Sequence, residues 1–145
     1  YLKSHEIGNA KILWHMTWAY QQDCLHTGFA NYGKDQMTMY NAILNAVDTQ
    51  VLTQPMVDGV IPAGTAIQNL RTSVLGDTLT RDGFHLDLGI GRYIAGLCVV
   101  KALVGLDIDN VTFAPEGVSE EQRKLAIAVA NAACAKPFET TNINK

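Results

Sequence analysis

The residues best suited to do chemistry lie in one short run, in which Asp82 stands three residues before His85 where a turn leads toward a helix. Gly83 between them permits a tight turn, so the Asp82 carboxylate can accept a hydrogen bond from His85 Nδ1. That bond fixes the imidazole tautomer that leaves Nε2 free to take a proton. Acyl-transfer catalysis requires this of a general base and its orienting acid. We therefore predict His85 and Asp82 as catalytic residues.

The same spacing also has a purely structural interpretation. An aspartate in front of a helix is often its N-cap, because its carboxylate accepts hydrogen bonds from the backbone amides of the first turn. The chain would then be a non-catalytic binding or structural α/β domain, in which Asp82 only caps the helix after His85. The sequence leaves both hypotheses open.

The apolar periodicity predicts the elements that must position this pair. A strand at 11–17 is apolar on both faces, which is typical of a strand buried inside a parallel sheet, and a second strand is expected at 57–62. Helices are expected at 35–53 and 65–73, from after His85 to Val104 with Gly105 as the stop, and from Ser119, with a Ser119–Gln122 capping box, to before Pro137. The long connection 21–34 is a candidate ligand-binding loop, and the tail 138–145 is expected to fray. This order predicts an α/β fold with about two parallel strands.

A family resemblance adds to this interpretation. The Asp-Gly-Phe-His run at 82–85 and the glycine-rich helix start at 88–95 resemble the last sequence block of the SGNH (GDSL-like) hydrolases. Residues 60–69 and 12–20 resemble the last strand of that superfamily and the strand before it, so the resemblance spans about residues 10–105. It implies a three-layer α/β/α flavodoxin-like fold, with 1–145 as the C-terminal part of a single domain. It also implies a serine ester hydrolase, often acting on acetylated carbohydrates in the periplasm or outside the cell, with no cofactor.

The nucleophile that this resemblance requires has no counterpart in the chain. The family carries it in a Gly-Asp-Ser or Gly-Asn-Ser motif, whereas the only serines here are Ser4, Ser73 and Ser119, and none has that context. The oxyanion-hole residues cannot be placed either. We therefore expect the serine, and the neighbouring strands, to come from an N-terminal half or a companion chain, and we expect the 145-residue chain alone to be inactive.

Aromatic and polar residues follow the first predicted strand. Trp18 and Tyr20 are predicted to wall a pocket beside His85 and to stack on a sugar or acyl group; the alternative is that they are core aromatics under the long loop. Thr17 and Gln21 are candidate hydrogen-bond donors at the same rim. A small-molecule or carbohydrate ester is the expected substrate.

The cysteines and charged side chains elsewhere favour structural roles. Cys98 and Cys134 are expected to be buried thiols, whereas Cys24 lies in a polar loop where exposure is possible and is the alternative nucleophile for His85. Arg71 and Arg92 are expected to form structural ion pairs, with Asp77 or Asp87, rather than to clamp an anion. The four side chains that could in principle bind a metal follow no compact ligand pattern, and we predict none: His5, His15, His26 and Asp23. His15 is instead expected to be buried in the first strand with a hydrogen-bond partner.

Composition excludes little beyond this. With 145 residues, 48% hydrophobic and 17% charged, the chain has apolar side chains enough for a sizeable core. The net charge of -3, without a basic patch or polybasic run, predicts no nucleic-acid partner and no membrane association. No run reaches the roughly 18 to 20 apolar residues of a membrane span, and no secretion signal is visible.

Overall fold

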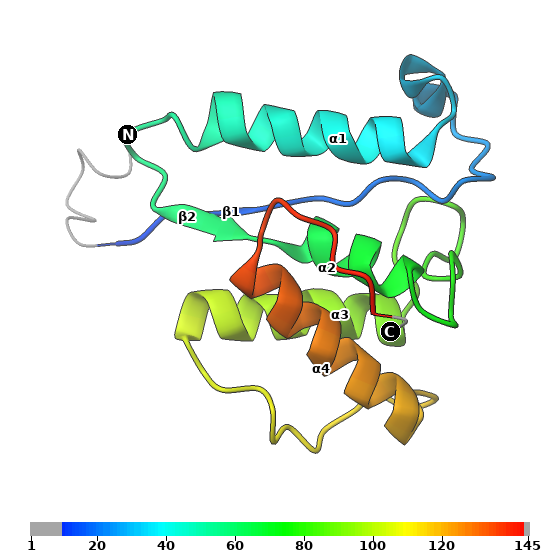
Figure 1. Ribbon diagram of the computed structural model, residues 1–145, viewed down its shortest axis with the longest axis vertical. Coiled ribbons are helices and arrows are strands. Elements are labelled where there is room, and N and C mark those ends of the chain that lie inside the picture. Colours follow the sequence, from blue (N-terminus) through cyan, green and yellow to red (C-terminus); the bar gives the residue numbers. More distant parts are fainter. Residues whose placement is uncertain (1–9, 144–145) are drawn as a thin grey trace.

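The computed structural model describes residues 10–143, which form an α/β fold with a two-stranded parallel sheet (Figure 1). The strands are β1 (Leu13–His15) and β2 (Gly59–Ile61), in the register Leu13↔Gly59, Trp14↔Val60 and His15↔Ile61. The helices are α1 (Gln36–Ala46), α2 (Ala63–Arg71), α3 (Ile90–Val99) and α4 (Glu120–Ala135). A 3-10 helix covers Thr27–Tyr32, and π-helical turns at Val47–Val51 and Val100–Val104 prolong α1 and α3. The predicted α/β class and the order of elements are confirmed.

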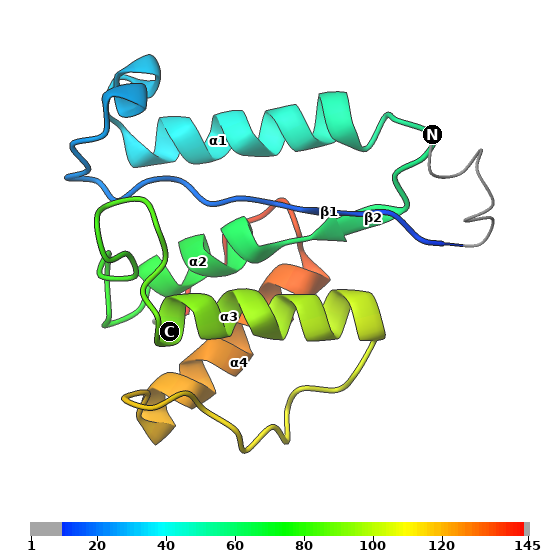
Figure 2. The ribbon, with the colours of Figure 1, turned by 180° about the vertical axis from the view of Figure 1, so that it is seen from behind.

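Helices lie on both sides of the strands. Helix α1 runs along one side, and α3 and α4 lie on the other (Figures 1 and 2). The larger core joins β2 to α2, α3 and α4, with Ile67, Leu70 and Ile94 fully buried. A smaller core joins the segment after β1 to the 3-10 helix and α1 through Phe29 and Tyr40. The chain leaving β1 therefore contributes to both sides.

The first strand is shorter and more exposed than its sequence predicts. Trp14 is 46% exposed, and His15 is exposed as well, so the expectation of a buried, hydrogen-bonded His15 is wrong. A strand is covered on both faces only where neighbouring strands and helices surround it. Within residues 10–143, β1 pairs with β2 alone.

The predicted helix ends are confirmed where they depend on local chemistry. Asp35 Oδ1 accepts a hydrogen bond from Thr38 N at 2.7 Å and caps α1. Ser119 and Gln122 form the expected capping box of α4. Gly105, with φ of 73°, ends the π-helical extension of α3 in the left-handed conformation.

The C-terminal tail is ordered against α2, so the expectation that it frays is wrong over its described part. Thr141 N donates to Asn69 Oδ1 at 2.6 Å, and Ile143 N donates to Thr72 Oγ1 at 3.0 Å. Asn69 is fully buried, and its side chain needs such partners. Periodicity could not reveal this contact, because the partners lie about seventy residues apart.

The cysteines follow the sequence interpretation only in part. Cys98 is fully buried in the core and Cys134 is partly buried, as expected for structural thiols. A hydrogen bond with Cys134, followed by burial, raises the pKa of Cys98. Cys24 is buried rather than exposed. Separately, none of the helices in the described part of the chain has the length and apolar character needed to cross a bilayer.

The tightest backbone crossing supplies a stability test. A Cβ on Gly64, at the start of α2, would lie 1.9 Å from the carbonyl oxygen of Thr17. We expect Gly64→Ala to lower the free energy of unfolding by about 3 kcal/mol, because two backbone segments must separate. Gly96→Ala in α3 is the control, since a Cβ there meets nothing within 4 Å, and it should raise stability by about 0.5 to 1 kcal/mol. Urea unfolding of both variants checks this, and equal stabilities would contradict the crossing.

Candidate active site

The Asp82–His85 pair lies in a closed loop between α2 and α3, beside the segment that follows β1 (Figure 2). An antiparallel bridge between Thr80 and Leu86 closes the loop, with Arg81 N donating to His85 O at 2.9 Å. Leu79 and Leu86, at the base of the loop, are buried in the larger core. The loop is at the carboxyl end of the strands, where open α/β sheets bind ligands.

The structure brings the two predicted catalytic side chains together. Asp82 Oδ2 lies 2.7 Å from His85 Nδ1. The other carboxylate oxygen, Oδ1, accepts hydrogen bonds from His85 N at 2.8 Å and Phe84 N at 3.2 Å. The hydrogen bond with the His85 side chain, followed by that with the His85 backbone, lowers the pKa of Asp82 to about 2. Asp82 is therefore ionised at neutral pH and oriented by three hydrogen bonds.

The ring of His85 is accessible from solvent. Its side chain is 53% exposed, and no hydrogen bond to Nε2 is formed by the side chains or backbone of residues 10–143. One side of the ring packs on Phe84, with ring centroids 4.2 Å apart. The imidazole is thus oriented through Nδ1, while Nε2, on the opposite edge, has no hydrogen-bond partner among the described residues.

Gly83 permits the turn, as predicted, and also makes a close contact that the sequence did not indicate. Its φ is +90°, and a Cβ would lie 3.0 Å from Cys24 Sγ and 3.2 Å from Cys24 Cα. Its carbonyl accepts a hydrogen bond from Gln21 N at 2.7 Å. The loop is therefore packed directly on the chain that follows β1.

Trp18 and Tyr20 support this loop from below. Trp18 Nε1 donates to Phe84 O at 2.8 Å, and the Tyr20 ring packs between Phe84 and Phe29 with centroid distances of 5.6 and 5.8 Å. Both contact the residue next to His85, and neither lines the hollow beside Asp82. This arrangement matches the alternative of core aromatics, and stacking on a substrate stays a prediction.

A partly buried ion pair fixes the neighbouring loops. Arg71 Nε contacts Asp77 Oδ1 at 2.7 Å, and Arg71 Nη2 donates to Ala19 O at 2.9 Å. Asp77 Oδ2 also accepts hydrogen bonds from Gln22 N and Gln36 Nε2 at 2.7 and 2.8 Å. The structural role expected for Arg71 is confirmed. Arg92, for which a structural ion pair was also expected, is instead exposed on the surface of α3.

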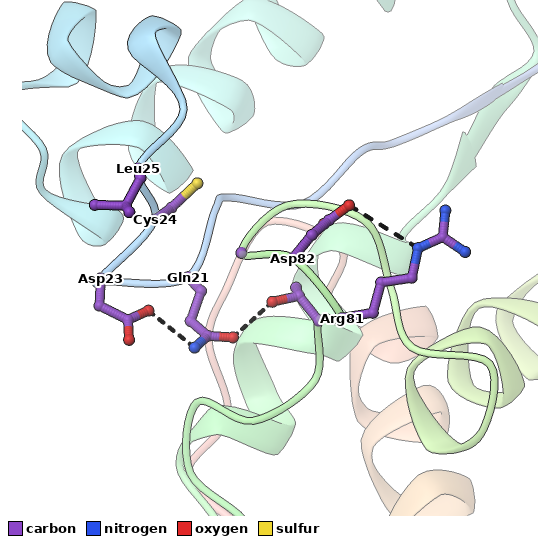
Figure 3. A pocket seen from close by; sticks show the side chains of 8 residues that line it. Gln21, Asp23, Cys24, Leu25, Arg81 and Asp82 are labelled. Atoms are coloured by element: carbon purple, nitrogen blue, oxygen red, sulfur yellow. Dashed lines mark hydrogen bonds and ion pairs between the residues drawn. The ribbon is translucent and has the colours of Figure 1, made fainter.

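A shallow hollow of about 290 Å³ lies behind the carboxylate (Figure 3). Gln21 crosses it, donating through Nε2 to Asp23 at 2.9 Å and accepting from Thr80 Oγ1 at 2.6 Å. Asp82 borders this hollow, but His85 is not part of its lining. Thr17 is exposed and does not line it. Of the two predicted rim donors, Gln21 contacts the loop that carries Asp82 and His85.

The capping function assigned to Asp82 in the structural alternative is wrong. Helix α3 begins at Ile90, and its first amides are bound by Asp87: Oδ1 accepts from Gly89 N at 2.7 Å and Oδ2 from Gly91 N at 3.0 Å. The sequence analysis missed this role, although an aspartate two residues before a glycine-rich helix start is a recognisable capping signal. Asp82 binds amides of its own loop and is left to hold His85.

The other candidate groups have structural partners. Ser73 Oγ accepts from Leu75 N at 3.2 Å, and Ser119 Oγ accepts from Gln122 N at 3.2 Å. His26 Nδ1 accepts from Gly28 N at 3.1 Å. The described residues contain no group of three or more His, Cys, Asp or Glu side chains placed to hold a metal ion, while Ser4 and His5 lie outside those residues.

The chain is an α/β protein that carries an aspartate-oriented histidine on a loop at the carboxyl end of its strands. Comparison with known proteins shows its family. Residues 2–133 match the family described as Domain of unknown function (DUF4886), and the chain belongs to this family. A solved structure of a DUF4886 family protein from Bacteroides uniformis is 40% identical, with a TM-score of 0.88. The match covers 92% of this chain and 51% of the related chain, so this chain spans about half the length of that relative. No curated protein matches.

The depressed pKa of Asp82 gives a test of the pair. We expect the Asp82 carboxyl to titrate with a midpoint of about 2, below its ordinary value of 3.8, when followed by carbon-detected NMR. Because its folded-state pKa is lowered, the stability it contributes is present above pH 3.8 and is lost as the pH falls toward 2. In His85→Ala the midpoint should rise toward 3.8, but not fully, because the backbone amides remain. An unchanged midpoint in this variant would show that the imidazole does not hold the carboxylate.

Proposed function

We propose that this chain supplies the histidine and aspartate of a Ser-His-Asp triad in an ester hydrolase. His85 takes the proton of a serine hydroxyl as it attacks the ester carbonyl, and later returns it to the leaving alcohol. Asp82 orients His85 and stabilises its charged form. The observation that carries the proposal is the 2.7 Å contact between Asp82 Oδ2 and His85 Nδ1, on a ring that is 53% exposed.

The architecture of the loop supports this assignment. Catalytic groups need a geometry held by hydrogen bonds and packing around them. Asp82 is held by two backbone amides, while Gly83 O and Phe84 O are held by Gln21 N and Trp18 Nε1. These hydrogen bonds fix the backbone on both sides of Asp82 and so support a defined position for the His85 ring.

The nucleophile is proposed to lie outside the described residues. The two described serines cap or terminate helices, and the chain covers only 51% of its Bacteroides uniformis relative, which therefore has room for a further catalytic block. We propose that an N-terminal half or companion chain carries the serine and adds strands beside β1. The complete domain is then the three-layer flavodoxin-like sandwich of the SGNH hydrolases.

The substrate is proposed to be a small ester, possible classes being acetylated carbohydrates, lipids and other esters. The carbohydrate alternative rests on the SGNH resemblance, since Trp18 and Tyr20 lie under the loop rather than in a described hollow. A secreted or periplasmic location has the same basis. No nucleic acid, membrane or cofactor is part of this proposal.

Esterase kinetics on the intact protein, including the portion proposed to carry the serine, test the triad. With a short-chain ester such as p-nitrophenyl acetate, His85→Ala and Asp82→Asn are each expected to lower kcat by about 10³-fold or more, because the first change removes the base and the second removes the carboxylate that orients it. His26→Ala is the matched control. It is also an exposed imidazole near Phe84, but its Nδ1 is bound to Gly28 N, and its kcat should stay within about threefold of the wild type.

Two results would contradict the proposal. Equal rates for the wild type and His85→Ala would favour the alternative of a non-catalytic binding or structural module. Turnover by the 145-residue chain alone, abolished by Cys24→Ala, would identify Cys24 as the nucleophile in place of serine. Circular dichroism melting of each variant separates loss of activity from loss of fold.

A further inference from the structure

An apolar groove of about 390 Å³ runs along helix α3, apart from the Asp82–His85 loop. One wall is the outer face of α3 together with Leu88, which precedes the helix. The other wall is the segment that leads to α4 and contains Val111, Phe113 and Pro115. Its volume is within the range of small-molecule sites, roughly 300 to 1,000 Å³. Large apolar side chains in it stay in water, with Leu88 66% and Phe113 69% exposed.

The hydrogen bond between Tyr93 and Phe113 joins the two walls, and further hydrogen bonds occupy other polar atoms of the lining. Tyr93 Oη donates to Phe113 O at 2.6 Å, and Arg123 Nη1 donates to Val111 O. Pro115 O accepts from Val118 N at 3.1 Å, and proline has no amide hydrogen to offer. A peptide seated here would bury backbone groups with few partners, which is costly. The lining suits a ligand with no internal polar groups, such as an alkyl chain.

A regular stripe on α3 forms the floor of this groove. Arg92, Gly96 and Val100 are four residues apart and lie on one helix face, over roughly 12 Å. A Cβ added to Gly96 would meet nothing within 4 Å, so the absence of a side chain leaves the groove open. Glycine inside a helix is less stable than alanine, so this opening has an energetic cost.

Arg92 is the only charged side chain among the described residues that line the groove, and it is exposed. A guanidinium binds a carboxylate through two parallel hydrogen bonds. We propose that the groove binds a single-chain aliphatic carboxylate, with its head group at Arg92 and its alkyl chain over Gly96 toward Val100. This site does not depend on ester hydrolysis at His85.

Calorimetric titration of the protein with monomeric decanoate and its shorter homologues tests the groove. The dissociation constant should fall about fourfold with each methylene that the groove buries. Gly96→Leu should raise it by about tenfold or more, because the new side chain takes the place of several ligand methylenes. Gly96→Ala is the matched control and should retain binding. Both variants should melt no lower than the wild type, so that lost binding cannot be attributed to unfolding.

Two further measurements separate the head group and the catalytic loop from the groove. Arg92→Gln should weaken decanoate binding and leave decanol binding unchanged, since only the carboxylate needs the guanidinium. His85→Ala should bind decanoate like the wild type, so a failure of the triad proposal leaves this one intact. Unchanged affinity in Gly96→Leu would overturn the proposal. So would a dimer of the ligand-free protein that Gly96→Leu dissociates, because the groove would then be an interface between copies.

Discussion

The division of the Asp82 carboxylate between two tasks is the interaction on which the site depends. One oxygen binds the amides of Phe84 and His85 and so shapes the loop, while the other binds His85 Nδ1. An ionised carboxylate can accept all three hydrogen bonds at once, which a neutral side chain of the same size cannot do equally well. Loop shape and ring orientation therefore both depend on Asp82, and truncation of its side chain removes the hydrogen bonds that support each of them.

That carboxylate is effective only because the chain leaving β1 holds the loop from beneath. Gln21 N and Trp18 Nε1 bind the carbonyls of Gly83 and Phe84, and Cys24 fills the space beside Gly83. The Arg71–Asp77 pair then fixes the same segment to α2 through Ala19 O. The His85 ring is therefore exposed to solvent, while the loop that carries it is held in place by the segment that follows β1.

Local chemistry was readable from the sequence, and tertiary contacts were not. The Asp82–His85 pairing and the capping box at Ser119 each join residues three positions apart, so both contacts could be predicted from neighbouring residues in the sequence. The hydrogen bond from Trp18 to Phe84 spans 66 residues, and the contact of Thr141 with Asn69 spans 72. These long-range contacts decide that Trp18 supports the loop and that the tail is ordered, and no periodicity contains them.

Helix α3 links the loop to the rest of the fold through a contact that leaves no room for a side chain. A Cβ on Gly91 would lie 2.7 Å from Leu79 O and 2.6 Å from Asp87 Oδ2. The first turn of α3 therefore rests directly on the base of the loop, and Asp87 fastens it there by binding the amides of Gly89 and Gly91. Because the Leu79 carbonyl also accepts a hydrogen bond from Asp87 N, any displacement of this helix moves the bridged segments at the base of the loop that carries Asp82 and His85. The orientation of the Asp82–His85 pair is in this way a property of the packed core as well as of the loop that carries it.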